Sequence, residues 1–284
     1  MEFKKIPLDI DYEKLGLEKP DVTPCLECYL PGDASYKEMK IDKLNNTILI
    51  LPGGGYGMLS SREHDPIAFQ FLAAGFTVFA LKYSVKPYTF PTALFEAYTA
   101  ISMIRKNAEE WLVDTNRISV CGFSAGGHLT ACTGAYMNEK FVKDVFGDTD
   151  EYKPNALVLS YPVITAGEYA HKGSFKNLLG KEELSEEDIA YHSIENRITA
   201  DFPPSFVWHT AEDNAVPVMN SLLLCQEFAK NKVKFELHIY PEGPHGLALS
   251  NHITEKSGKF PAPEKPRAWV KECVDFLDNI AYNN

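Results

Sequence analysis

Short apolar runs alternate with longer segments of helical period along most of this 284-residue chain. The runs lack a polar residue at every second position, which is typical of strands buried on both faces of a parallel sheet. In the longer segments Ala, Leu and Phe recur at spacings of three and four, which predicts helices. The alternation predicts an α/β fold, a mostly parallel twisted sheet with helices on both faces. The predicted strands are 47–51, 76–81, 117–123, 156–161, 205–210 and 235–240, and the predicted helices are 65–74, 92–107, 126–137, 217–230 and 264–280.

Two parts of the chain interrupt the alternation. Residues 1–45 are less regular and are predicted to supply one or two antiparallel edge strands, with 26–30 as the candidate. The segment 165–200 is rich in Glu, Lys, Ser and Asn and is predicted to pass over the carboxyl edge of the sheet as a small cap. No Pro-, Gly- or Ser-rich linker divides the sequence, so we expect a single domain spanning 1–284.

Acidic residues outnumber basic ones, 39 against 28, which gives a formal net charge of −11. Such a surface repels polyphosphates and anionic membranes, so we expect no nucleic acid and no membrane partner but a neutral or weakly charged small molecule. No apolar run approaches the roughly 18–20 residues that span a bilayer. The first residues lack the apolar core of a signal peptide, so a cytoplasmic location is expected. The oligomeric state stays open, a homo-oligomer included.

Six cysteines are spread through apolar segments. This distribution favours small core residues in a reducing compartment over a disulfide framework. Cys25 and Cys28 have the spacing of half a zinc site, but no second Cys or His pair lies near them and their segment resembles a strand. A metal site is therefore not expected.

The segment 118–129, ISVCGFSAGGHL, runs from a predicted strand through Gly-x-Ser-x-Gly into a predicted helix. This pattern predicts a nucleophile elbow, because a serine on a tight strand-to-helix bend presents its hydroxyl at the sheet edge. Side chains at Gly122 and Gly126 would collide with neighbouring elements in so sharp a turn. Ser124 is the predicted nucleophile, and the alternative is an ordinary Gly-rich turn.

Three consecutive glycines, 53–55, follow an earlier predicted strand. Glycine lets the backbone turn its N–H groups toward a bound ligand. A phosphate-binding loop is disfavoured, since no Gly-Lys-Ser/Thr follows and the Rossmann spacing is missing. With an elbow downstream, the amides of Gly54, Gly55 and Ala125 are predicted to form an oxyanion hole.

Eight histidines compete for the role of catalytic base. His245 lies in the loop after the last predicted strand, where a catalytic histidine belongs when the chain order is Ser, acid, His. We predict His245 as the base, with His252 as its main rival. By their positions, structural roles are favoured for His128, His209 and His238.

Glu212 and Asp213 stand side by side in the turn after the predicted strand 205–210. They cannot both point at one histidine. Asp213 is the predicted acid, since it is the shorter carboxylate and the Val-Pro start of a helix follows; a helix-capping acid is the alternative. A carboxylate in this role holds the imidazole tautomer and stabilises the imidazolium that forms when the serine is deprotonated.

The motifs LPGGGY, FLAAGF, KYSV, GFSAGGHL, HTAED and GPHG occur in an order that resembles the α/β-hydrolase superfamily over nearly the whole chain. Together they look like the esterase/lipase group that includes hormone-sensitive-lipase-like enzymes and, more closely, bacterial acetyl- and feruloyl-esterases acting on decorated xylan. The lipase-like group usually has His before the three glycines, and Pro52 here favours the carbohydrate-esterase branch. The resemblance implies the α/β-hydrolase fold, an acyl-serine mechanism and no cofactor. It also implies that Tyr56 and the segment 165–200 shape an acyl and sugar pocket.

Three functions remain open from the sequence. The first is a serine carboxylesterase that removes acetyl, or small aromatic acyl, groups from sugars such as xylo-oligosaccharides. The second keeps the chemistry but cleaves an amide, as in an arylformamidase-like or exopeptidase-like enzyme. The third is a hydrolase scaffold that binds a ligand without turnover; the presence of Ser124, Asp213 and His245 argues against it.

Overall fold

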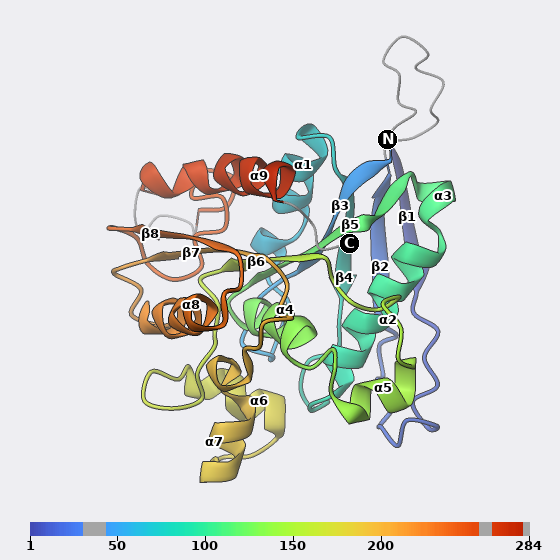
Figure 1. Ribbon diagram of the computed structural model, residues 1–284, viewed down its shortest axis with the longest axis horizontal. Coiled ribbons are helices and arrows are strands. Elements are labelled where there is room, and N and C mark those ends of the chain that lie inside the picture. Colours follow the sequence, from blue (N-terminus) through green and yellow to red (C-terminus); the bar gives the residue numbers. More distant parts are fainter. Residues whose placement is uncertain (31–43, 256–262, 281–284) are drawn as a thin grey trace.

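The computed structural model describes residues 1–30, 44–255 and 263–280. Within these ranges one sheet has the strand order β1-β2-β4-β3-β5-β6-β7-β8. The six strands from β4 to β8 in this order run parallel, and β1 and β2 join antiparallel at one edge. The predicted α/β fold is confirmed (Figure 1). The strands are β1 Glu2–Pro7, β2 Cys25–Leu30, β3 Asn45–Leu51, β4 Thr77–Lys82, β5 Val113–Phe123, β6 Ala156–Ser160, β7 Ser205–Thr210 and β8 Phe235–Tyr240.

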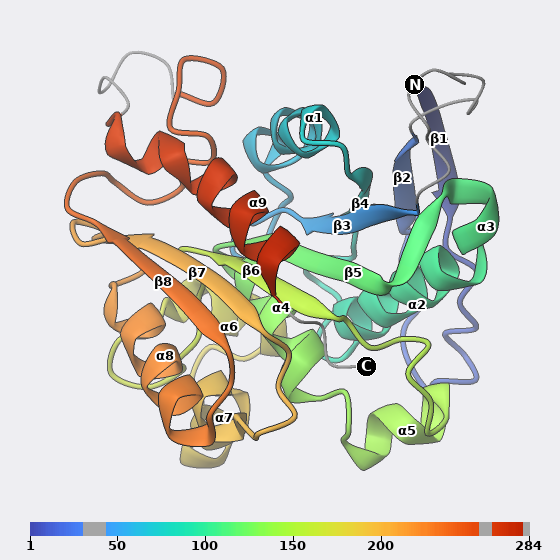
Figure 2. The ribbon, with the colours of Figure 1, turned by 45° about the horizontal axis from the view of Figure 1, so that its top comes forward.

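Helices cover both faces of the sheet, as Figures 1 and 2 show. On one face α1 and α9 pack on a core that includes Phe71, Trp208 and Trp269. On the other face α2, α4 and α8 pack on a larger core that includes Tyr98, Leu129 and Phe228. The helices are α1 Asp65–Ala73, α2 Thr92–Lys106, α3 Ala108–Trp111, α4 Ala125–Ala135, α5 Lys140–Phe146, α6 Lys172–Leu179, α7 Glu186–His192, α8 Met219–Asn231 and α9 Trp269–Asn279, with 3-10 turns η1 Ser61–Glu63, η2 Ile194–Arg197 and η3 Lys265–Ala268.

The central strands lie close to their predicted ranges. Every residue of β6 and β7 is buried, and β7 and β8 have the predicted bounds. β5 begins at Val113, four residues before its predicted start. Its first residues are mostly polar, so no apolar run marks the beginning of the strand. The short helices α3 and α5 were not predicted; with four and seven residues they are too short for a helical period to show.

The two irregular parts of the sequence form an edge of the sheet and a helical segment. β2 is an antiparallel strand and β1 adds a second one outside it, while part of the predicted region, 31–43, lies outside the described residues. The segment 165–200 folds into α6, α7 and η2. This segment packs η2 against α4 and α8, below the sheet in the view of Figure 1.

All six cysteines are free thiols, and all but Cys25 are buried. Cys25 and Cys28 are three residues apart on β2 and therefore point to opposite faces of the sheet. Their side chains cannot chelate one ion from that strand. In the described part of the chain, no helix is long and apolar enough to cross a membrane.

Candidate active site

A cavity of about 570 Å³ opens at the carboxyl edge of the parallel strands. Its walls come from the loop after β3, from the β5–α4 junction, from the start of α6 and from the loop after β8. The lining residues include Gly54, Gly55, Arg62, Glu63, Ser124, His171, Asn177, His245 and Gly246. Residues far apart in the sequence thus meet where ligands bind in open α/β folds.

Ser124 occupies the sharp bend between β5 and α4. Its backbone has φ 53° and ψ −118°, a conformation that L-residues avoid and that functional sites retain at a cost of about 1–3 kcal/mol. A Cβ at Gly122 would lie 2.1 Å from the carbonyl oxygen of Gly126, and a Cβ at Gly126 would lie 2.1 Å from that of Leu51. The two glycines therefore let the bend close against its neighbours.

A hydrogen-bond chain joins Ser124, His245 and Asp213. The Ser124 Oγ lies 2.7 Å from His245 Nε2, and His245 Nδ1 lies 2.6 Å from Asp213 Oδ2. Because an ionised carboxylate only accepts, Nδ1 carries the proton and Nε2 is left to accept from the serine hydroxyl. The three residues have the geometry of a nucleophile, its base and an acid that orients the base.

Asp213 is buried and accepts hydrogen bonds on both oxygens. Oδ1 takes the backbone amides of Ala215 and Val216, each at 2.9 Å, and Oδ2 takes His245 at 2.6 Å and His209 at 3.3 Å. Burial opposes the charged form, but the bonds from His209 and His245 outweigh it and hold the pKa of Asp213 well below its usual range. The carboxylate is therefore ionised across the neutral pH range.

The neighbouring acid takes a different position. Glu212 is exposed and, within the described residues, accepts the Gly243 amide alone, at 3.2 Å. The helix that follows, α8, begins at Met219, too far along for Asp213 to cap it. Of the two acids, the structure brings Asp213 to His245.

Among the described residues, Ser124 Oγ has no hydrogen bond with His252, His128 or His238. His252 is exposed in the turn after the His245 loop. His128 is buried, with Nδ1 2.8 Å from the Tyr56 hydroxyl, and burial lowers its pKa to about 3. His238 pairs with Glu236.

His209 has more than the structural role that its position on β7 suggested. Its Nε2 lies 2.9 Å from the Val216 carbonyl oxygen and 3.3 Å from Asp213 Oδ2, and its Nδ1 lies 2.8 Å from the Ser221 hydroxyl. The imidazole therefore supports the buried carboxylate. The sequence signal was available, because His209 stands four residues before Asp213 at the end of a strand.

The three amides predicted to bind an oxyanion lie around Ser124. Gly54 and Gly55 have φ +132° and +62°, and both line the cavity. In the part of the chain that the structure describes, neither glycine amide has a hydrogen-bond acceptor. Ala125 is the first residue of α4, where a helix leaves its amides without an internal partner. This arrangement can receive a negatively charged oxygen.

Glu63 is a residue that the sequence reasoning missed. Its carboxylate is buried and accepts the Gly53 amide at 2.9 Å and the Tyr161 hydroxyl at 2.8 Å. The Tyr161 ring packs edge-on to His245, with ring centroids 5.1 Å apart. Glu63 thus connects the glycine loop to the surroundings of His245.

Arg62 makes a second connection to the His245 loop. Its guanidinium donates to the carbonyl oxygens of Gly246 and Thr254, at 2.8 and 2.9 Å. Ser61, Arg62 and Glu63 form η1, a turn too short to show a helical period, so neither role has a signal in the sequence.

The structure does not bring the Tyr56 side chain to the cavity. Tyr56 is 3% exposed, and its ring packs against Tyr83 and His128 in the core. The segment 165–200 does reach the cavity, through His171, Gly173 and Asn177.

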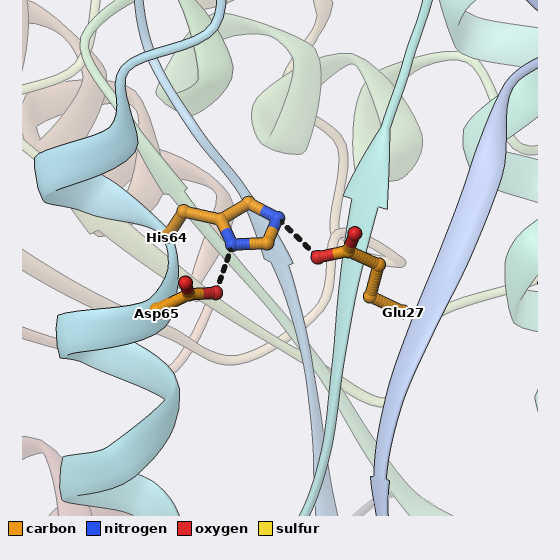
Figure 3. Close-up of side chains that lie close together, drawn as sticks. All are labelled: Glu27, His64 and Asp65. Atoms are coloured by element: carbon orange, nitrogen blue, oxygen red, sulfur yellow. Dashed lines mark hydrogen bonds and ion pairs between the residues drawn. The ribbon is translucent and has the colours of Figure 1, made fainter. Parts of the chain in front are cut away.

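A second group of titratable side chains lies outside the cavity, between β2 and the start of α1 (Figure 3). His64 stands between two carboxylates, with Nε2 3.3 Å from Glu27 and Nδ1 2.7 Å from Asp65. Their ligand atoms lie within 4.8 Å of one another, a spacing that could hold a cation. However, the ammonium groups of Lys5 and Lys82 each lie 2.8 Å from Glu27 Oε1. They already balance the negative charge of the carboxylate that would bind a cation. The group therefore has the character of an ion-pair network.

The sheet order and the elbow at Ser124 define the class: this is an α/β hydrolase. The model of the BD-FAE family matches residues 34–228, and the chain belongs to this family.

Two proteins of similar sequence are named as a xylanase and an acetylxylan esterase. The chain is 35% identical over 239 residues to endo-1,4-beta-xylanase B of Butyrivibrio fibrisolvens, which is 80% of this chain and 35% of that protein. It is 29% identical over 227 residues to an acetylxylan esterase of Xylanibacter ruminicola, 78% of this chain and 43% of that protein. The chain thus spans less than half the length of either relative.

Solved structures match along almost the entire chain. An acetyl ester-xyloside bifunctional hydrolase from Caldicellulosiruptor lactoaceticus superposes with a TM-score of 0.81 at 33% identity, over 97% of this chain and 95% of that one. A carboxylesterase from Lactobacillus plantarum gives a TM-score of 0.81 at 28% identity, over 100% of both chains. The fold is therefore the one these proteins share.

Proposed function

We propose that the protein is a serine carboxylesterase that deacylates, and above all deacetylates, acylated sugars such as xylo-oligosaccharides through an acyl-serine intermediate. The observation that carries the proposal is the hydrogen-bond chain from Ser124 through His245 to the buried Asp213 carboxylate, at 2.7 and 2.6 Å. The sugar part of the proposal is supported by the names of similar proteins, an acetylxylan esterase and an acetyl ester-xyloside hydrolase.

The proposed reaction has two halves. In the first, Ser124 Oγ attacks the carbonyl carbon of the ester while its proton passes to His245 Nε2, and the amides of Gly54, Gly55 and Ala125 bind the oxygen that becomes negative. The tetrahedral intermediate then collapses: the bond to the alcohol oxygen breaks, and that oxygen takes the proton from His245. In the second half water attacks the acyl carbon while its proton passes to His245; the bond from that carbon to Ser124 Oγ then breaks, Oγ takes the proton from His245, and the acid and the free serine are released.

Release of acetate from acetylated xylo-oligosaccharides by the purified protein tests the proposal. The Ser124→Ala variant serves as the blank, and p-nitrophenyl acetate serves as a reference ester. Rapid, Ser124-dependent release supports sugar deacetylation. Cleavage of the activated reference alone would keep the serine mechanism and remove the sugar assignment.

A further inference from the structure

The start of α6 lies over the glycine loop of the cavity. His171 is the N-cap residue of α6 and lines the cavity together with Gly55, Ser124 and His245. Asn177, on the next turn but one, donates from Nδ2 to the Gly55 carbonyl oxygen at 2.8 Å and fixes the helix to the loop. A Cβ at Gly55 would stand 3.9 Å from His171 Cε1, so the imidazole lies beside the proposed oxyanion donors.

The tautomer of His171 follows from its cap. The Ser174 backbone amide donates to His171 Nδ1 at 3.2 Å, and the Ser174 Oγ lies 2.8 Å from the same nitrogen. The same amide also donates to the His171 carbonyl oxygen at 2.9 Å, and the side-chain cap of α6 uses Nδ1 as an acceptor. The ring hydrogen of the neutral imidazole is therefore on Nε2.

The charge state of His171 follows from its neighbours. Burial lowers its pKa, the nearby His245 lowers it further, and the Asp213 carboxylate offsets only part of this. The imidazole is neutral at pH 7 and above, with one donor and one acceptor.

Among the described residues the donor of His171 has no protein partner, unlike Arg62 and Glu63 in the same wall. Arg62 is engaged by the carbonyl oxygens of Gly246 and Thr254, and Glu63 is engaged by Gly53 and Tyr161. His171 Nε2 has no acceptor across the described residues, and the ring borders the cavity. His171 thus borders the space where substrate would lie, with a ring donor that no described residue engages.

We infer that His171 donates a hydrogen bond from Nε2 to a hydroxyl or ring oxygen on the alcohol side of the ester, and so selects polyhydroxylated alcohols over apolar ones. An acetyl group has one oxygen, that of the carbonyl, and the proposed oxyanion hole binds it. The bridging ester oxygen is protonated by His245 on leaving. Further acceptors belong to the alcohol, so the inference rests on the proposed function and names the feature of the substrate that this site recognises.

Two variants separate the donor from the helix cap. His171→Asn keeps an oxygen that can cap α6, because Asn is a strong N-cap residue, but it removes the donor at Nε2. His171→Gln removes the cap at Nδ1 but places an amide N–H near the position of Nε2. Lys172→Asn, at the exposed next position, is the matched control.

The readout is the ratio of kcat/KM for a methyl mono-O-acetyl-β-xyloside to kcat/KM for cyclohexyl acetate, which has a ring but no hydroxyl. One neutral hydrogen bond predicts that the ratio falls about five- to tenfold in His171→Asn. The ratio should stay within about twofold of wild type in His171→Gln and in the control. Thermal unfolding checks that each variant folds.

The outcomes separate the inference from the proposed function. A wild-type preference for the xyloside ester that His171→Asn leaves intact would overturn the inference and keep sugar deacetylation. A fall that His171→Gln shares equally would also overturn it, because the cap and not the donor would then be responsible. A wild type with no preference for the xyloside ester, while still cleaving both esters, would remove both.

Discussion

The Asp213 carboxylate sits at the point where four donors converge: two backbone amides on Oδ1, and His245 and His209 on Oδ2. This pattern decides which protonation state each partner takes. The two amides require an oxygen at Oδ1, and His245 requires an acceptor at Oδ2 if its Nε2 is to accept from Ser124. The reactivity proposed for Ser124 therefore depends on a carboxylate and not only on a polar side chain of that shape.

We expect Asp213→Asn to lower kcat about 10²- to 10⁴-fold without abolishing activity. The amide oxygen of Asn would occupy the Oδ1 position, which faces two amides, so its NH₂ group would face His245 and move the ring proton to Nε2. Steady-state kinetics on p-nitrophenyl acetate measure the effect. Glu212→Gln is the matched control and should stay within about twofold of wild type; a larger loss in that variant would reverse the assignment of the acid.

At the scale of elements, the site depends on how the loop after β3 is held. Gly53 is bound by Glu63, Gly55 is bound by Asn177, and the Met58 amide donates to the Gly54 carbonyl oxygen at 3.2 Å. The loop is thus fixed from η1, from α6 and within itself. The Gly53 amide is used in this way, whereas at Gly54 and Gly55 the carbonyl oxygens are engaged and, among the described residues, the amides are not.

Two adjacent glycines of this loop should respond differently to alanine. A Cβ at Gly54 would lie 2.0 Å from the Met58 carbonyl oxygen, whereas a Cβ at Gly55 meets nothing closer than 3.8 Å. We expect Gly54→Ala to displace the loop and lower kcat about 10²-fold, the typical effect of losing one oxyanion donor. Gly55→Ala keeps its amide and should lose much less. Equal losses, with both variants folded by circular dichroism, would contradict this account of the loop.

The elements that could be predicted from sequence are those whose burial leaves a clear pattern. β7 and β8, the elbow at Ser124 and the loop containing His245 combine an apolar run with a fixed motif, and each lies where it was expected. Glu63 could not be given a role, because its partners Gly53 and Tyr161 are brought to it by the fold and not by a sequence motif. The contact of His209 with Asp213 has a sequence signal, their spacing of four residues, but that spacing alone does not show that the side chains meet. Tyr56 was assigned to the pocket by resemblance, but the direction of its side chain depends on packing against Tyr83 and His128.

At the scale of the whole molecule, a buried polar link joins the segment between β1 and β2 to α2 and to the segment after β4. Glu96 on α2 is fully buried, and its carboxylate accepts the Tyr12 hydroxyl at 2.9 Å and the Ser84 amide and hydroxyl at 2.6 Å each. Burial outweighs these hydrogen bonds and raises the pKa of Glu96 from 4.5 to about 7.

This raised pKa predicts a pH dependence of stability. Between about pH 4.5 and 7 the folded state keeps a proton on Glu96 that the unfolded state releases, so the Glu96 contribution falls as the pH rises through this window. Gln does not titrate. We therefore expect the unfolding free energy of wild type minus that of Glu96→Gln to fall by up to about 3 kcal/mol between pH 4.5 and 8. Urea unfolding at both pH values measures it, and a difference that stays constant or rises would contradict the prediction.

The central claim is that Ser124 is the nucleophile, and covalent labelling tests it most directly. A fluorophosphonate reacts with a serine only where a base and an oxyanion hole activate the hydroxyl. We predict one phosphonyl group per chain, located on Ser124 by peptide mass spectrometry, absent from Ser124→Ala and slowed by acetylated xylo-oligosaccharide. Esterase activity that survives in folded Ser124→Ala, or a label on another residue that accompanies loss of activity, would contradict the account.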